Sequence, residues 1–480
     1  MTSPEAKKEV KEIPRKADDL SDWYTQVCLR AELVDYAPVR GCIVLRPYGF
    51  AIWEMIQQAL DARFKATGHV NAYFPLLIPE SLLLREADHV EGFAPEVAWV
   101  TQGGGERLTE RLAIRPTSEA IIGTMYAKWI HSHRDLPVLI NQWCNVMRWE
   151  KATRPFLRTL EFLWQEGHTA HATREEAALE VQRILEIYRE VAEEVLALAV
   201  IKGRKSESEK FAGAEATYAI EALMPDGKAL QAGTSHEFGQ NFSKAYDITF
   251  ADTDEQLKHA FTTSWGVSWR ILGGVIMLHG DDRGLVLPPL IAPQQVVVVP
   301  IPKKGDESVM PAARALAAEL AATSRTLLDE RPGLSAPWKF NEWEMRGVPL
   351  RVELGPRDIA AGQVTIARRD TFEKSVVPAS DAGARIVQLL SEMQAGLLTK
   401  ARTFRDERTI EAADRHSLIA ALHKQAGFVR APWCERPECE LEIKAATSAV
   451  SRIVGVAPAH GSCAFCDRPA KAKAYFARSY

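Results

Sequence analysis

The sequence lacks the glycine-rich signatures that usually identify a nucleotide-binding fold. It has neither a GxxxxGK[ST] phosphate loop nor a GxGxxG motif after a strand-like segment. The three glycines at 103–105 have the spacing of neither motif, and we interpret them as a hairpin or loop tip. If the chain binds a nucleotide, it must therefore do so through side chains.

Long apolar runs and an excess of one charge are absent as well. No apolar run approaches the ~20 residues of a membrane span, and residues 1–20 lack the apolar centre of a signal peptide. The net charge of −4 does not decide for or against a nucleic-acid partner, because such binding depends on a basic face. We expect a cytoplasmic protein with no membrane partner.

Cysteine is sparse over most of the chain, which makes its clustering near the end informative. The last fifty residues hold two close pairs, Cys434 with Cys439 and Cys463 with Cys466. Two pairs separated by a longer spacer fit tetrahedral zinc held by four thiolates. We expect a structural Zn²⁺ with no open position and no catalytic role. The alternative is a cluster of free thiols that has lost its metal.

The hydrophobic periodicity predicts alternating helices and strands with a change of character near residue 290. The paired prolines of 287–302 precede a buried-looking strand and a small α/β pattern. The expected helices are Phe50–Thr67, Glu119–His131, Glu175–Leu198 and Pro311–Leu328, with a mostly helical region over 383–425. The expected strands are Asn71–Ile78, Val138–Trp149, Tyr246–Phe250, Val296–Val299 and Gln363–Arg368, with 343–354 as a further element.

The segment 145–171, NVMRWEKATRPFLRTLEFLWQEGHTAH, mixes arginine, glutamate, histidine and aromatic residues. An ordinary core strand or surface helix does not need this mixture. Guanidinium groups supply forked donors for phosphate or carboxylate, and aromatic faces stack on a base or ring. The segment therefore predicts a site for a charged, partly flat ligand. The alternative is a solvated charged loop between two strands.

Three further segments combine polar and small residues in a similar way. RPTSE, at Arg115–Glu119, opens a predicted helix, so its simpler interpretation is a capping motif. LQAGTSHEFGQNF, at 230–242, would let backbone approach a ligand, or would form a polar turn. In 262–289, Arg270 precedes an apolar helix and needs an anionic partner, which is either a ligand or an internal carboxylate.

Together these segments resemble the class II aminoacyl-tRNA synthetases. RWE with a loop and R-x-x-x-F is similar to their motif 2, S-x-R-x-x-G-G to motif 3, and residues 50–79 to motif 1. The strings RPTSE, PFLRTLEFLWQEGHTAH, GTSHEFGQNFSKAYDI and HGDDRGLVLPP closely resemble the prolyl-tRNA synthetases in their archaeal and eukaryote-like form. The 117 residues between Glu150 and Ser268 are too few for the editing insertion of the common bacterial form.

The resemblance implies a fold and a set of domains. These are a flexible N-terminus (1–20), an α+β catalytic domain with a six-stranded antiparallel sheet (21–290), an α/β anticodon-binding domain (291–400) and a small α/β zinc-binding domain (401–480). Motif 1 forms a dimer interface in this class, so a homodimer is implied. The string WEMRGVPLRVELGPRDI carries the resemblance to the anticodon-binding domain. Its anticodon candidates are Arg346, Arg351, Glu353, Arg357 and Asp358, and an amphipathic strand with a turn is the alternative.

The resemblance also implies an activity. L-proline and ATP, with Mg²⁺ bridging phosphate oxygens, would form prolyl-adenylate and pyrophosphate, and the prolyl group would pass to the 3′ end of tRNA(Pro). Attack of a carboxylate on phosphorus joins two anions, so catalysis must supply position and positive charge. Without the editing insertion, weak activation of alanine and cysteine is expected, because a small pocket rejects similar amino acids poorly.

The family's functional residues carry over to matching positions. Arg148 and Arg270 would be catalytic: Arg148 would hold the α-phosphate and the proline carboxylate, and Arg270 the outer phosphates and one face of adenine. The ATP site would comprise Arg148, Glu150, Arg158, Thr159, Phe162, Gln231, Thr234 and Arg270. The proline site would comprise Thr117, Glu119, Arg148, Trp164, Glu166, His168, Phe211, His236 and Ser268. His168 and His236 could instead be hydrogen-bonded core histidines. The terminal Tyr480 would fold back towards the ligands, with a frayed end as the alternative.

Other functions fit less of the sequence. A threonyl-type enzyme would need a zinc site in its catalytic domain, and no comparable Cys/His set stands there. A synthetase-like regulatory or tRNA-sensing protein would tend to lose the motif arginines, yet Arg148, Arg158 and Arg270 are all present. A simple RNA-binding module does not explain RPTSE or the motif 2 loop.

Overall fold

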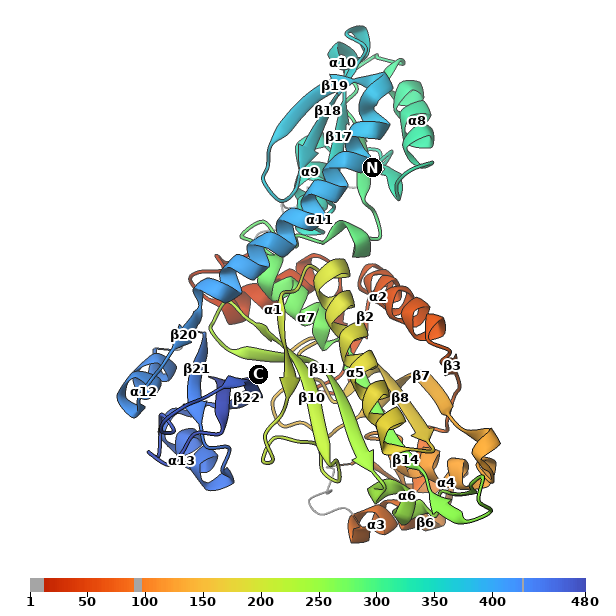
Figure 1. Cartoon of the computed structure of the whole chain (residues 1–480). Helices are drawn as coiled ribbons and strands as arrows, with labels where there is room; N and C mark the ends of the chain where they lie inside the picture. The colour runs from red at the N-terminus through yellow and green to blue at the C-terminus, as the bar shows by residue number, and fades with distance from the viewer. Residues whose placement is uncertain (1–12, 90–96, 425–426) are drawn as a thin grey trace.

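A sheet of eleven strands runs through the lower half of the molecule (Figure 1). The computed structural model describes residues 13–89, 97–424 and 427–480. Six strands at the centre of the sheet are antiparallel to their neighbours, as expected. In spatial order they are β9 (Val200–Arg204), β10 (Ala216–Leu223), β11 (Ala229–Gly239), β14 (Phe261–Ser268), β8 (Glu161–His171) and β7 (Val138–Met147). A short strand, β3 (Val70–Asn71), adds to one edge in parallel.

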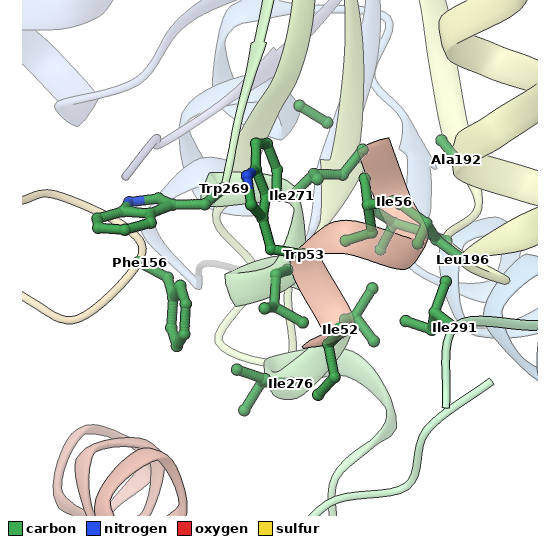
Figure 2. Close-up of a cluster of buried hydrophobic side chains, with 14 of the residues drawn as sticks. Ile52, Trp53, Ile56, Phe156, Ala192, Leu196, Trp269, Ile271, Ile276 and Ile291 are labelled. Carbon is green, nitrogen blue, oxygen red and sulfur yellow. The ribbon is translucent and has the colours of Figure 1, made fainter. Parts of the chain in front are cut away.

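Residue alternation gives the central sheet one apolar and one polar face. On β14, Trp265 and Val267 belong to the large core, while Ser264, Gly266 and Ser268 line a cavity on the opposite face. The core face is covered by α2 (Pro47–Ala66), α5 (Arg174–Glu190) and α7 (Arg270–His279). Figure 2 shows Ile52, Trp53 and Ile56 of α2 meeting Ile271 and Ile276 of α7. The polar face is left open for a site.

Close packing on the core face requires glycine at one position of β8. A Cβ atom at Gly167 would lie 2.1 Å from the ring of Trp265, its partner in the antiparallel register. Helix α5, one of the three that cover this face, begins at a capping box in which the Thr173 hydroxyl accepts from the amide of Glu176. Helix α5 ends at Glu190, and a short π-helical segment, Val191–Val195, completes the helix expected over Glu175–Leu198.

Two predictions near the N-terminal end have different outcomes. The glycines at 103–105 do lie at a hairpin, between β5 (Trp99–Gly103) and β6 (Glu106–Ile114). The single strand expected over Asn71–Ile78 is wrong. The chain leaves the main sheet after β3 and joins β6 in a separate three-stranded sheet as β4 (Leu77–Pro79). Pro75 lies in the crossing, and it has no N–H for a continuous ladder.

The other outcomes in this half concern element ends. Helix α4 (Glu119–Trp129) lies close to its expected bounds. The strand expected over Tyr246–Phe250 is partly wrong, because α6 (Asn241–Tyr246) precedes β12 (Thr249–Ala251). The hairpin strand β13 (Leu257–His259) pairs with β12, and α1 (Leu20–Arg30), β1 (Val34–Tyr36), β2 (Ile43–Leu45) and α3 (Glu80–His89) complete the region.

A second, five-stranded sheet occupies the upper half of the molecule (Figure 1). Its order is β16 (Thr326–Leu328), β15 (Val296–Pro300), β17 (Leu350–Leu354), β18 (Gln363–Arg368) and β19 (Lys374–Pro378). Helices α8 (Val309–Leu320), α9 (Ala336–Met345), α10 (Pro356–Ala360) and the long α11 (Ala382–Glu407) belong to this region. The sheet and its helices form the small α/β pattern expected after residue 290.

Two expected elements of this region are wrong in extent. The helix over Pro311–Leu328 ends at Leu320, whose carbonyl accepts from the Ser324 hydroxyl at 2.9 Å, and residues 326–328 form a strand. The element over 343–354 is two elements. Helix α9 ends at Met345, Gly347 turns the chain with a φ of +70°, and β17 follows.

The C-terminal residues extend the main sheet instead of forming a sheet of their own. Strands β20 (Thr409–Glu411), β21 (Phe428–Trp433), β23 (Ala472–Ala477) and β22 (Val450–Pro458) continue it beyond β9. The junction is the pairing of Val454 with Arg204. Helices α12 (Arg415–His423) and α13 (Pro437–Thr447) complete this part, which we call the C-terminal module (residues 409–480). In the part of the chain that the structure describes, no helix is long and apolar enough to cross a membrane.

Candidate active site

A cleft on the polar face of the central sheet brings together the residues of both predicted sites. Its main cavity has a volume of about 210 Å³ and is lined by all nine residues of the predicted proline site. Of the predicted ATP residues, Phe162, Gln231, Thr234 and Arg270 line the same cavity. A neighbouring cavity of about 40 Å³ is lined by the other three, Glu150, Arg158 and Thr159. The two cavities share Arg148, Phe162, Ser268 and Arg270.

Arg148 lies where the two cavities meet. Its Nε donates to the carbonyl of Pro116 at 3.1 Å, and its guanidinium lies over the rings of Phe162 and Trp164 at 5.6 and 5.4 Å. The side chain reaches solvent through the cleft. Burial by the surrounding protein lowers the pKa of the guanidinium, and the negative charges of Glu119, Glu166 and Glu150 oppose this shift. The contacts with the Pro116 carbonyl and the two rings orient the guanidinium, and its remaining N–H groups are available to a ligand in the cleft.

Arg270 is the second guanidinium of the cleft. Its Nε donates to the carbonyl of Leu157 at 3.0 Å, and no carboxylate of a described residue lies within ion-pair distance of it. Burial lowers its pKa to about 10, and the nearby positive charges of Arg148 and Arg158 act in the same direction. The internal salt bridge considered from the sequence is therefore wrong, and the clustered positive charge favours an anionic ligand.

Glu166 organises the floor of the cleft without pointing freely into it. Its carboxylate accepts from the Ser118 hydroxyl at 2.5 Å, the Gln142 amide at 2.7 Å and the Ser118 amide at 3.1 Å. It also lies 3.1 Å from Nε2 of His168. The capping interpretation of RPTSE is wrong, because Ser118 occupies the N-cap position of α4 but its hydroxyl binds Glu166. Glu166 therefore acts by holding its neighbours.

The pKa values of the two histidines of the cleft are shifted in opposite directions. Burial disfavours the charged form of His168, but its hydrogen bond to Glu166 and the charge of Glu119 outweigh burial and raise its pKa. Burial, together with the charges of His168 and Arg148, lowers the pKa of His236 to about 3, so His236 is neutral. Its Nδ1 lies 2.9 Å from the Thr217 hydroxyl and its ring 4.8 Å from that of Phe211. His236 and Phe211 thus form an uncharged wall.

The raised pKa of His168 gives a testable pH dependence of stability. Folding favours its protonated form, so its contribution is fully present below the unfolded pKa of about 6.5 and is lost as pH rises through the folded value. The stability difference between the wild type and His168→Gln is expected to be larger near pH 6 than near pH 9. Urea unfolding at both pH values measures it. The exposed His460→Gln should show no such change, and a His168 difference that grows with pH would contradict the assignment.

Several lining residues were missed in the sequence. They are Glu209, Thr217, Ala232, Gly233, Ser264, Trp265 and Gly266. The period of two along a strand could have found Ser264 and Gly266, because they precede Ser268 on the same face. No local signal identifies Glu209, which lies in the irregular segment between β9 and β10.

The four C-terminal cysteines converge as their spacing predicts. All four Sγ atoms lie within 4.8 Å of one another, with 3.5 Å between Cys434 and Cys466 and 3.8 Å between Cys439 and Cys463. Sulfur atoms on a tetrahedral zinc with bonds of about 2.3 Å would be roughly 3.8 Å apart. None of the four forms a disulfide, so all four sulfur atoms are available as ligands and the donor set fits Zn²⁺.

The anticodon candidates are mostly engaged within the chain. Arg346 lies 2.6 Å from Glu32, and Arg351 lies 2.9 Å from both Glu344 and Glu353. Asp358 accepts from the amide of Gly355 at 2.9 Å, which caps α10. Of the five candidates only Arg357 is exposed. The anticodon assignment of these five residues stays a prediction, and strand β17 itself is buried along its whole length.

The chain end is ordered by pairing with the central sheet. Ser479 bridges Ala229 at the start of β11, and the Tyr480 amide donates to the Ala229 carbonyl at 3.2 Å. The Tyr480 hydroxyl lies 3.2 Å from the sulfur of Met277. The frayed end considered from the sequence is therefore wrong.

Comparisons with known proteins agree with this architecture. Residues 99–278 match the tRNA synthetase class II core domain (G, H, P, S and T), residues 295–389 an anticodon binding domain, and residues 416–480 the C-terminal domain of prolyl-tRNA synthetase. The proline–tRNA ligase of Alkaliphilus oremlandii is 54% identical over 480 residues, with 100% of both chains covered. That of Rubrobacter xylanophilus is 56% identical over 473 residues, covering 98% of this chain and 99% of the relative.

A solved structure extends the similarity to three dimensions. The crystal structure of prolyl-tRNA synthetase from Cryptosporidium parvum, complexed with halofuginone and AMPPNP, matches with a TM-score of 0.92 and 43% identity. The match covers 98% of this chain and 100% of that chain. The class II fold expected from the sequence is confirmed, and the chain belongs to the prolyl-tRNA synthetase family.

Proposed function

We propose that the protein is an ATP-dependent proline–tRNA ligase. It joins L-proline to ATP, releases pyrophosphate, and transfers the prolyl group from the adenylate to the 3′ end of tRNA(Pro), releasing AMP. The observation that carries the proposal is the meeting of two cavities at Arg148, one walled by aromatic rings and one lined by arginines. Relatives at 54% and 56% identity over nearly the whole chain carry the same name.

The larger cavity suits a small secondary ammonium on an apolar ring. Thr117 and Glu119 supply acceptor oxygens for the two N–H groups of proline, and the Thr117 hydroxyl donates to the Glu119 carboxylate. Trp164, Phe211 and the neutral His236 supply the wall against the ring. Glu166 and the Ser118 hydroxyl hold the floor of the pocket in place.

The chemistry needs charge and alignment more than a proton transfer. The proline carboxylate attacks the α-phosphorus in line, and Arg148 lies where it can hold both reacting anions. Arg270 and Arg158 are assigned to the outer phosphates, and Phe162 with the Arg270 plane to the adenine. Mg²⁺ bound together with ATP would neutralise part of the phosphate charge.

Proline-dependent exchange of radioactive pyrophosphate into ATP tests the proposal directly. Exchange that requires proline, followed by charging of a tRNA(Pro) transcript, is the expected result. A synthetase-like regulatory or tRNA-sensing protein would bind tRNA without supporting exchange. No exchange with proline at saturating ATP would refute the ligase assignment.

The specificity of the pocket gives a further prediction. Alanine and cysteine are expected to support slow exchange, because an apolar pocket discriminates by only ~10–200-fold per methylene. The chain also has no room for an editing insertion between Glu150 and Ser268. Exchange rates with proline, alanine and cysteine give the discrimination between proline and the other two, and phenylalanine serves as a control too large for the pocket. Absence of exchange with both alanine and cysteine would contradict the prediction.

Three finer features belong to the same proposal. Cys434, Cys439, Cys463 and Cys466 would bind one structural Zn²⁺, for which the sulfur separations are suitable. A homodimer is supported by exposed apolar side chains in and near motif 1, namely Tyr36, Val39, Val44, Phe50, Val70 and Tyr73. We also propose domains at 1–20, 21–290, 291–400 and 401–480, with α11 (Ala382–Glu407) running across the last boundary. A cytoplasmic location, where translation uses the product, belongs to the same proposal.

A further inference from the structure

A cluster of four charged residues, three of them buried, lies beside the cleft but contains none of the predicted site residues. Arg452 of β22 donates to both oxygens of Glu221 on β10, through Nη2 at 2.7 Å and Nε at 3.2 Å. Lys205 donates to the same carboxylate at 3.2 Å. Glu209 lies 3.9 Å from Nη1 of Arg452. The side chains of Arg452, Glu221 and Lys205 are 5%, 0% and 1% exposed, so these three lie inside the protein, while Glu209 is partly exposed.

The cluster reaches the cleft at two points. Glu221 is the register partner of Gln231, which lines the main cavity. Alternation along β10 places Glu221 on the same face as Thr217, which also lines that cavity, while Ile220 and Ala222 face the core. Glu209 lines the cavity itself. Burial lowers the pKa of Arg270, and the charge of Glu221 opposes that shift, so the two groups interact.

Arg452 is the member of the cluster that comes from outside the catalytic core. It lies on β22 of the C-terminal module, two residues before Val454, whose pairing with Arg204 joins the module to β9. Arg204 adds a second link, because its Nη2 donates to Glu435 at 2.7 Å. The module is therefore attached to the segment that carries Lys205 and Glu209, and this segment forms one side of the cleft.

The cluster is balanced in charge, with two cations and two anions. Removing Arg452 alone would leave the cluster with a net negative charge. This charge would lie beside Gln231, on the side of the cleft assigned to ATP. It would also leave Glu221 free to move, because only Lys205 would still bind it. Both effects oppose the binding of a polyanion.

We propose that Arg452 is a positioning residue for amino-acid activation, by which the C-terminal module fixes Glu221 behind the ATP side of the cleft. The inference rests on the proposed ligase function and deepens it, since it makes the module a working part of the catalytic centre. Arg452 touches neither substrate in this assignment and acts only through Glu221 and Glu209.

Arg452→Met tests the inference in the full-length protein by proline-dependent pyrophosphate exchange. The KM for ATP is expected to rise about tenfold, a change within the range of coupling between contacting residues. The KM for proline should change by less than about threefold, because the change acts on the ATP side. Arg430→Met is the matched control, because Arg430 lies on β21 of the same module and pairs with Glu411 at the surface.

The same replacement in the Glu221→Gln background separates positioning from general destabilisation. If Arg452 acts through Glu221, Arg452→Met should change the KM for ATP less than about threefold there. An equal rise in both backgrounds, or a lower melting temperature with an unchanged KM for ATP, would overturn the inference. If Arg452→Met does not fold, Arg452→Lys carries the test. A single ammonium cannot reproduce the forked contact of Nε and Nη2 with both Glu221 oxygens, so the KM for ATP should rise only when Glu221 is present. The wild-type protein is measured in every experiment. If it shows no proline-dependent exchange, the ligase function fails; if only the variants behave differently from expectation, the role of Arg452 fails.

Discussion

Replacing Arg148 with alanine is expected to abolish proline-dependent pyrophosphate exchange, with a loss of at least about 10³-fold in kcat/KM. Arg148 is shared by both cavities and lies over Phe162 and Trp164. In the proposed function, the carboxylate and the α-phosphate would approach each other there. Two anions cannot be brought together there without a positive charge between them. Because this charge matters more in the transition state than in either bound substrate, kcat should fall together with kcat/KM.

Arg154→Ala is the matched control for Arg148. Arg154 lies in the same motif 2 loop and binds Ser21, but it lines neither cavity. It is expected to retain exchange within about threefold, since it touches no reacting group. Circular dichroism and thermal unfolding should confirm that both variants are folded. A folded Arg148→Ala enzyme with more than about a tenth of wild-type kcat/KM would remove Arg148 from the chemistry.

The residues of the cleft could be predicted from the sequence because they lie in long strings with distinctive chemistry. RPTSE and the 145–171 segment hold most of the predicted site residues, and the structure brings both to the same cleft. The strings also explain the main errors. RPTSE satisfies the capping pattern, but a hydroxyl in it is used by the distant Glu166. A short sequence window does not contain that partner.

The parts that could not be predicted depend on contacts between distant segments. Nothing near Arg452 indicates that its partner is Glu221, because the two are 231 positions apart and meet only through the pairing of β22 with β9. The strand break after Asn71 has a similar cause. Pro75 interrupts the ladder locally, but the positions of β7 and β6 decide which sheet each part of the chain joins.

Loss of one cysteine of the C-terminal cluster is the second change with a large expected effect. Cys439→Ser is expected to remove Zn²⁺ and to unfold the loops around the site, giving an early thermal transition. Structural zinc sites contribute about 10–16 kcal/mol of apparent binding energy, which is lost with a ligand. Cys439 is buried beside Cys463, so a serine there also leaves a buried hydroxyl without the metal. Zinc content by mass spectrometry and a calorimetric scan measure both effects.

Cys42→Ser removes a thiol outside the cluster and should leave zinc content and the transitions unchanged. Wild-type protein purified without chelator should hold one zinc per chain, and less than about half an equivalent with an intact fold would contradict the metal site. The cluster and β22 belong to one module, and β22 carries Arg452 to Glu221. Zinc loss should therefore raise the KM for ATP as Arg452→Met does, although the metal performs no chemistry. If zinc-depleted protein shows the early transition yet keeps a wild-type KM for ATP, Arg452 stays in place without the metal, and the zinc site and the cleft are independent.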